Sequence, residues 1–211
     1  MANRKELKKR SLKSTVREYL EAIALAIVVT LFVRAFIIQA FRIPTGSMTD
    51  TLLEGDFLFV SKFIYGAQVP FTNWHLPKIR EPRPGDIIVF KYPEDPKRDF
   101  IKRCVAVGGQ TIEIRNKEMY VDGRKQNAGY VKHVDDRIYS AFESPRDNFG
   151  PFYVPKGYLF MMGDNRDNSH DSRFWGPLDE KLVKGEALVL YWSWDREHFR
   201  PRFSRLFHLI K

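Results

Sequence analysis

Cysteine is almost absent from this sequence of 211 residues. Cys104 is the only one, so no intrachain disulfide can form, and a cysteine-built metal site or redox pair is excluded. Helical patterns are scarce as well, because after residue 50 no stretch of ten or more residues spaces its apolar side chains as a helix would. Only one long apolar segment is present. The chain is still long enough to bury a core as one or two domains.

Positive charge is in excess, but it is unevenly distributed. The formal net charge is +9, and residues 1–19 contribute +5 of it through seven Lys/Arg against two Glu. The other 192 residues carry 28 basic and 24 acidic side chains. A generally basic surface is therefore missing, and no nucleic-acid partner is expected.

The long apolar segment covers residues 20–41, in which 18 of 22 residues are apolar. As a helix it would be about 33 Å long, enough to cross a hydrocarbon core of about 30 Å. We predict a transmembrane anchor at 20–41 after a basic cytoplasmic segment at 1–19. The positive-inside rule then places residues 42–211 outside the cytoplasm.

Three other interpretations of this segment compete with an anchor. A cleaved signal peptide has the same basic-then-apolar order, but its apolar region is usually about 7–15 residues long and precedes a small-x-small site. A buried core helix is compatible with the longest uninterrupted apolar run, 22–29. An amphipathic surface helix is disfavoured because the polar residues are too few to form a face.

Short strand patterns separated by Pro and Gly fill the rest of the chain, which predicts an all-β region over 42–211. The strands are expected at 56–60, 86–92, 100–107, 111–114, 118–121, 158–162 and 186–194. Turn-forming residues are dense from about 116 to 151, so a small β insertion is predicted at about 108–157. No internal repeat is visible.

One serine and one lysine form a candidate catalytic pair. Ser47 lies in the stretch 42–48, which directly follows the apolar segment, with a second hydroxyl at Thr45. Lys102 lies in the strand pattern 99–107, where side chains alternate between two faces. Neither face of that strand has a solvated composition, so Lys102 or Arg103 is expected to be held among apolar side chains. Burial lowers the pKa of an amine, and a neutral lysine can act as the base for a serine.

The faces expected for this strand are Phe100, Lys102, Cys104 and Ala106 on one side and Ile101, Arg103, Val105 and Val107 on the other. An edge strand whose Lys102 reaches solvent or pairs with Asp99 explains the same pattern.

The stretch 163–176 is unusually rich in Asp, Asn and Ser, which predicts a tightly hydrogen-bonded turn. A calcium loop is disfavoured because Trp175 stands where a bidentate glutamate belongs. A Ser-His-Asp triad built on His170 and Asp171 lacks support, since neighbouring side chains in an extended segment point apart. Cys104 has no evident histidine partner and fits a small core residue better than a nucleophile.

Taken in order, five segments resemble bacterial type I signal peptidases, a family of membrane-bound Ser/Lys proteases. They are 43–48 (IPTGSM), 84–90 (PGDIIVF) with 92–93 (YP), 101–103 (IKR), 163–169 (GDNRDNS) and 171–173 (DSR). The resemblance covers most of the chain. It implies an all-β catalytic region of coiled sheets behind a single N-terminal transmembrane helix.

The resemblance also implies roles for individual residues. Ser47 would be the nucleophile and Lys102 the general base. The Ser47 N–H and the Thr45 hydroxyl would form the oxyanion hole, and Ser169 would orient the lysine. Gly163, Asp171 and Arg173 would support them, the last two as an ion pair. Apolar substrate pockets would be lined by Phe41, Ile43, Leu52 and Ile101.

The function implied is endopeptidase cleavage of signal peptides from preproteins at small-x-small sites. No metal and no cofactor are expected, because the chain supplies both nucleophile and base. The expected partners are preprotein signal peptides and membrane lipid. The expected location is the cytoplasmic membrane, crossed once, with the catalytic region on the extracytoplasmic side.

Two residues depart from the family pattern. Thr45 replaces a common serine and keeps the hydroxyl, although its methyl group restricts χ1. Asp50 replaces the proline of the usual Met-x-Pro-Thr-Leu and frees φ at that position. Some relatives also have two spans before the catalytic region, whereas one is visible here.

Two other function classes are compatible with parts of the sequence. One is a self-cleaving Ser/Lys protease like the LexA-type repressors, against which the apolar span and the lack of a helix-turn-helix argue. The other is a non-catalytic, membrane-tethered β-domain that binds an extracytoplasmic partner. The basic and aromatic segment 196–211 is expected to pack on the β-core, with contact to the membrane surface as the alternative.

Overall fold

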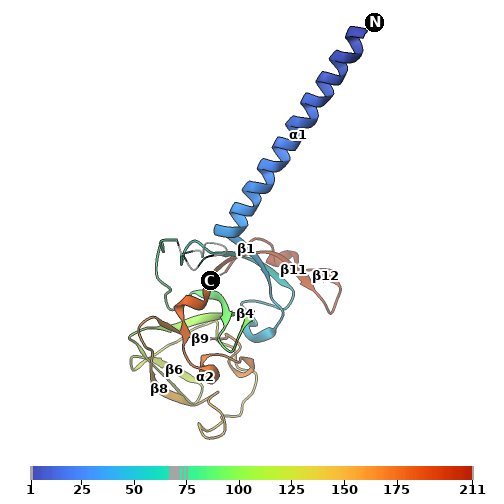
Figure 1. The fold of residues 1–211 in the computed structure, drawn as a ribbon. Helices are drawn as coiled ribbons and strands as arrows, with labels where there is room; N and C mark the ends of the chain where they lie inside the picture. The colour runs from blue at the N-terminus through green and yellow to red at the C-terminus, as the bar shows by residue number, and fades with distance from the viewer. Residues whose placement is uncertain (1, 67–71, 73, 75, 211) are drawn as a thin grey trace.

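One long helix precedes a β-rich body in the computed structural model, which describes residues 2–66, 72, 74 and 76–210 (Figure 1). The helix is α1, Ala2–Phe36. Side chains are described from residue 15 on, so most of the basic segment predicted at 1–19 lies outside them. Within α1, Thr15–Phe36 is long and apolar enough to cross a membrane, and none of that stretch is buried inside the protein. A core helix would be covered by other elements, so that alternative is wrong.

The helix ends before the predicted limit of 41. Residues Ile38–Arg42 form strand β1 instead, which pairs antiparallel with β2, Asp56–Ser61, from Ile38 opposite Ser61 to Arg42 opposite Phe57. Side chains along β1 are alternately exposed and half-buried, as expected for a strand at a sheet edge. Composition alone could not mark this break, because apolar residues suit a membrane helix and an edge strand equally.

The main sheet holds the middle of the chain together. Among the described residues it has nine strands in the order β1-β2-β11-β3-β4-β9-β10, with β12 and β13 also paired to β11. The bounds not yet given are β3 Ile87–Tyr92, β4 Asp95–Val107, β9 Tyr158–Met162, β10 Leu178–Asp179, β11 Val183–Asp195, β12 Arg200–Pro201 and β13 His208–Leu209. Every pairing in this sheet is antiparallel.

A second, four-stranded sheet lies between β4 and β9 in the chain. Its order is β7-β6-β5-β8, with β5 Thr111–Arg115, β6 Glu118–Val121, β7 Arg124–Lys125 and β8 Phe149–Tyr153. Figure 1 shows it on the side of the body far from α1. The remaining elements are η1 Gly46–Met48, η2 Arg166–Asn168, α2 Ser172–Trp175, η3 Glu180–Leu182 and η4 Phe203–Arg205. The prediction of an all-β catalytic region behind one apolar helix is confirmed.

A bulge in β4 changes the expected faces of that strand. The pairing of β4 with β9 shifts between Cys104 and Ala106. Beyond the bulge, Ala106 packs in a core cluster with Val105, whereas Val107 packs against the cluster that contains Cys104. The prediction for Ala106 and Val107 is therefore wrong, because strict alternation does not continue through an extra residue.

The C-terminal segment packs on the β-core through its backbone. Strands β12 and β13 pair with β11, and Ile210 packs against the core cluster beneath Ser47. The side chains of Phe199, Phe203 and Phe207 nevertheless remain exposed. Their contact with a membrane surface stays a prediction.

Candidate active site

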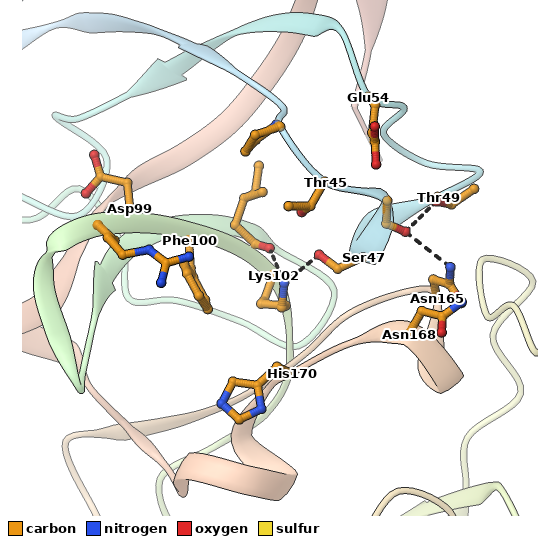
Figure 2. Close-up of a pocket in the computed structure, with 14 residues that line it drawn as sticks. Thr45, Ser47, Thr49, Glu54, Asp99, Phe100, Lys102, Asn165, Asn168 and His170 are labelled. Carbon is orange, nitrogen blue, oxygen red and sulfur yellow. Dashed lines mark hydrogen bonds between the residues drawn. The ribbon is translucent and has the colours of Figure 1, made fainter. Parts of the chain in front are cut away.

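Ser47 is presented by η1, a single turn between β1 and β2. The turn is anchored from below, since Met48 and Leu52 are fully buried in the same core cluster. It is anchored from the side by Asn165, whose backbone N–H donates to Ser47 O at 3.1 Å and whose Nδ2 donates to Gly46 O at 3.2 Å (Figure 2). These bonds hold Ser47 in one place.

The same bonds orient the N–H group of Ser47. Gly46 O also accepts from the backbone N–H and the hydroxyl of Thr49. In a trans peptide the C=O and N–H point in opposite directions. Because Gly46 O is directed at Asn165 and Thr49, the Ser47 N–H faces away from them. Thr45 lines the groove that also contains Ser47. Thr45 is exposed, so its hydroxyl is accessible to a substrate.

Lys102 comes from β4 and reaches the serine from the opposite wall (Figure 2). Its Nζ lies 2.6 Å from Ser47 Oγ and 3.2 Å from Ile101 O. Only 4% of Lys102 is exposed. Burial is the main cause that lowers the pKa of its amine to about 8, while Asp171 and Asp164 oppose this shift. Two residues 55 positions apart are thus brought into direct contact.

This geometry suits nucleophilic catalysis. With a pKa of about 8, roughly a tenth of the Lys102 amine is neutral at pH 7, compared with less than about a thousandth for an ordinary lysine. A neutral amine at hydrogen-bond distance from a hydroxyl can remove its proton as the oxygen attacks.

The neighbour of the lysine, Arg103, is equally buried and has a structural task. Its Nε and Nη2 donate to the two carboxylate oxygens of Asp164 at 2.9 and 2.8 Å, and its Nη1 donates to Gly85 O. The hydroxyl of Thr51 donates to the same carboxylate at 2.6 Å. The bidentate ion pair and the Thr51 hydrogen bond therefore connect β4, the segment 163–169 and the loop after Ser47.

A second buried ion pair lies behind the lysine. Arg173 donates through Nε and Nη2 to Asp171 at 2.8 and 2.9 Å, and Asp171 also accepts from the Gly163 N–H. Both side chains are at most 1% exposed. Burial alone would raise the pKa of Asp171, but the Arg173 charge and these hydrogen bonds hold it below its ordinary value.

Gly163 has no room for a side chain. A Cβ built on it would lie 2.2 Å from Ser169 Oγ and 2.5 Å from Ser47 O, well inside contact distance. A close approach of two backbone segments explains why this position lacks a Cβ. Any larger residue would push the serine loop away from the lysine.

Ser169 is buried beside the pair, but its predicted hydrogen bond to Lys102 is not formed in this structure. Its Oγ is buried and has no hydrogen-bond partner among the described residues. Ser169 lies at the C-terminal end of η2 with extended backbone. Its role in orienting the lysine remains a prediction.

The four predicted pocket residues fall into two groups. Ile101 lines a groove of about 700 Å³ that also contains Ser47 and Lys102. Ile43 and Leu52 are buried in the core cluster under that groove, and Phe41 packs against the same cluster. The last three do not line the groove in this structure, so their role as substrate pockets stays a prediction.

The structure does not support a calcium loop at 163–176, a triad built on His170 or a nucleophilic Cys104. The Asp164 and Asp171 carboxylates are taken by arginines, and no metal-binding group of three His, Cys, Asp or Glu occurs in the described part of the chain. His170 is exposed, with Nε2 3.1 Å from the Tyr92 hydroxyl. Cys104 is fully buried, which raises the pKa of its thiol and makes it a poor nucleophile.

Asp50 adopts a backbone conformation that proline cannot reach. Its φ is +79°, whereas the proline ring fixes φ near −65°. The side chain forms an ion pair of 2.8 Å with Lys132. Lys132 lies in the segment between β7 and β8 of the second sheet. The backbone of Lys132 forms an isolated β-bridge opposite Asn165: its N–H donates to Asp164 O, and its carbonyl accepts from the Arg166 N–H. The departure from the family pattern thus accompanies a different local backbone in this loop.

We expect Asp50→Pro to lower cleavage activity and the melting temperature, because the loop would have to abandon the left-handed region at position 50. Asp50→Gly is the matched control. It removes the same ion pair, which is worth at most about 1 kcal/mol at the surface, but accepts positive φ without strain. Melting and peptide-cleavage assays on both variants check this. Equal losses in the two variants would show that the ion pair matters and the backbone conformation does not.

Arg103, Asp164 and Asn165 lie within the segments that resemble the family, but the sequence patterns predict no role for them in the site. The available signal was the density of charged and amide side chains in segments whose other positions are apolar. Polar side chains there need partners when buried. Thr51, which joins the same network, carried no signal of its own.

Comparisons with known proteins agree with the resemblance in the sequence. The family model "Signal peptidase, peptidase S26" matches residues 16–192. "Signal peptidase I" of Pseudomonas aeruginosa is 32% identical over 222 residues, covering 90% of this chain and 78% of that protein. "Signal peptidase I" of Aquifex aeolicus is 34% identical, covering 84% and 85%. "Signal peptidase I P" of Bacillus subtilis subsp. natto is 32% identical, covering 90% and 96%.

A solved structure, a signal peptidase I of Enterococcus faecalis, is 27% identical with a TM-score of 0.41. The match covers 51% of this chain and 97% of that one.

Proposed function

The chain belongs to the peptidase S26 family of signal peptidases, and from this premise we propose that it removes signal peptides from preproteins with a Ser47/Lys102 dyad. The observation that carries the proposal is the distance of 2.6 Å between Ser47 Oγ and a lysine amine that is 4% exposed. A non-catalytic binding domain would have no use for a desolvated amine against a hydroxyl.

The reaction would proceed through an acyl-enzyme. Ser47 Oγ attacks the carbonyl carbon of the scissile bond while neutral Lys102 takes its proton. The Ser47 N–H and Thr45 hydroxyl stabilise the negative oxygen that develops. Protonated Lys102 then donates its proton to the leaving amine nitrogen. Neutral again, it removes a proton from the water that hydrolyses the ester to Ser47.

The groove would bind the substrate as an extended peptide. Ile101 gives it an apolar wall next to the serine. Small side chains beside the scissile bond would fit there, and larger ones would clash, which favours small-x-small sites. Preprotein signal peptides are therefore the proposed substrates.

The enzyme is membrane-bound through α1, and we assign the sides of the membrane from charge. Basic residues dominate before the apolar stretch Thr15–Phe36, which supports an N-terminus in the cytoplasm and a β-rich body outside the cytoplasmic membrane. In domain terms, 1–19 would be cytoplasmic, the anchor would follow, and the peptidase domain would carry the second sheet as an insertion at about 108–157.

Cleavage of a preprotein with one small-x-small site tests the proposal. The full chain in detergent micelles should release the mature protein with a single new N-terminus at that site. Ser47→Ala should release none, because no other hydroxyl contacts Lys102 Nζ in the described structure. A serine-directed probe should label the native chain at Ser47. Processing by the Ser47→Ala variant would overturn the proposed nucleophile.

A further inference from the structure

Glu54 lies beside the proposed cleavage site, and its carboxylate makes no hydrogen bond or ion pair with the described residues. It lines the groove that contains Ser47 and Lys102. Its Oε1 lies 3.6 Å from the position that a Cβ on Gly46 would occupy, next to the nucleophile. Figure 2 shows Glu54 on the Thr45–Thr49 side of Ser47, opposite Asp99 and Phe100 beyond Lys102. An extended substrate seated on Ser47 therefore lies close to this carboxylate.

The backbone that carries Glu54 is held firmly. Glu54 O accepts from Arg202 Nη1 at 3.0 Å, and the next residue, Gly55, donates to Ile43 O and accepts from the Trp194 N–H. Gly55 has φ +87°, and a Cβ there would lie 2.2 Å from Trp194 O. The turn at Glu54 and Gly55 thus packs against β11, and its backbone is fixed where the Glu54 side chain lines the groove.

The other charged or titratable side chains discussed for the groove each contact another residue of the protein. Asp99 is bound by Lys184 at 2.8 Å, and the Arg98 guanidinium lies over the Phe100 ring. His170 contacts the Tyr92 hydroxyl. In the part of the chain that the structure describes, the Glu54 carboxylate has neither a hydrogen bond nor an ion pair. It is the groove carboxylate left free to meet a charge on the substrate.

We propose that Glu54 is a specificity residue that favours preproteins with a lysine or arginine side chain at the subsite bounded by Gly46, Thr49 and Glu54. The inference rests on the proposed function, because it needs a peptide in the groove. Opposite charges a few ångströms apart attract, and a glutamate on the substrate at that subsite would be repelled. Because Glu54 is exposed, water and salt weaken both effects.

A charge scan of the substrate tests this. Peptides with one small-x-small site carry Lys, Gln or Glu at each flanking position in turn, and kcat/KM is measured with the full chain in micelles. At one position we expect Lys to exceed Glu by about tenfold at low salt. The ratio should approach one in Glu54→Gln, invert in Glu54→Lys, and shrink at about 1 M salt. Ratios within one variant cancel any general change in activity.

Glu143→Gln is the matched control, because Glu143 caps the loop around Ser140 and does not line the groove. It should keep the native ratios. Equal ratios in the native chain and in Glu54→Gln at every position would overturn the inference and identify Glu54 as a solvated surface residue. Failure of the native chain to cut even the neutral peptide would instead refute the proposed function.

Discussion

Replacing Lys102 with methionine is expected to lower kcat for preprotein cleavage by more than about 10⁴-fold, as in serine proteases that lose their base. Methionine fills a similar space and leaves Ser47 in place, but it has no atom that can take the serine proton. Gel-based processing under single-turnover conditions measures the loss. Retention of more than a few per cent of native activity would show that another group activates Ser47.

The pH dependence follows from the same amine. The base is active when neutral, and burial lowers its pKa to about 8. Activity should therefore rise about tenfold per pH unit below pH 8 and level off above it. An exposed lysine would put the break near 10.5. The profile of kcat/KM for the native chain thus reports directly on whether Lys102 is desolvated in solution.

The stability of the Lys102→Met variant separates a catalytic role of Lys102 from a structural one. The pKa of Lys102 is lower in the folded than in the unfolded chain, so the unfolded state binds more protons between about pH 8 and 10.5, and stability rises with pH there. Below that window the buried charge costs about 3 kcal/mol at 1.36 kcal/mol per pKa unit. Lys102→Met should accordingly be more stable than the native chain at pH 7, although inactive. A variant that is inactive because it has unfolded would contradict this.

Local patterns were enough to predict the strand that carries Lys102, but not the turn η1 that carries Ser47. The strand 99–107 follows from its composition, and β4 indeed includes it. The lack of a solvated face on that strand predicted burial of Lys102 or Arg103, and both are buried. Their contact partners could not be read locally. Ser47 meets Lys102, and Arg103 meets Asp164, across separations of 55 and 61 positions that only the assembled sheet sets.

Three features of the structure that the sequence patterns did not predict have the same physical origin. The break at Phe36 depends on whether β1 finds β2 as a partner, and apolar side chains do not encode that choice. The faces of Ala106 and Val107 depend on a bulge imposed by the pairing with β9. Positive φ at Asp50 is a property of the whole loop, held from the side by Lys132. In each case a tertiary contact decides between local states of similar energy.

Loss of the Asp171 carboxylate is expected to destabilise the fold strongly. In Asp171→Ala the Arg173 guanidinium, which is 1% exposed, would lose the charge that compensates it. Removing one partner of a buried pair costs about 3–5 kcal/mol. For a chain of this size that corresponds to a fall in melting temperature of roughly 6–20 °C. Thermal unfolding of the full chain in micelles, followed by circular dichroism, measures it.

The double variant Asp171→Leu, Arg173→Met tests whether the cost comes from the unpaired charge. It removes both ions and keeps the volume, so it should recover much of the lost stability. Activity should not recover with it, because Asp171 also accepts from the Gly163 N–H at 3.1 Å, and Gly163 touches both Ser47 and Ser169. A double variant as unstable as the single one would show that this hydrogen bond and the packing, more than the buried charge, hold the segment behind Lys102 in place.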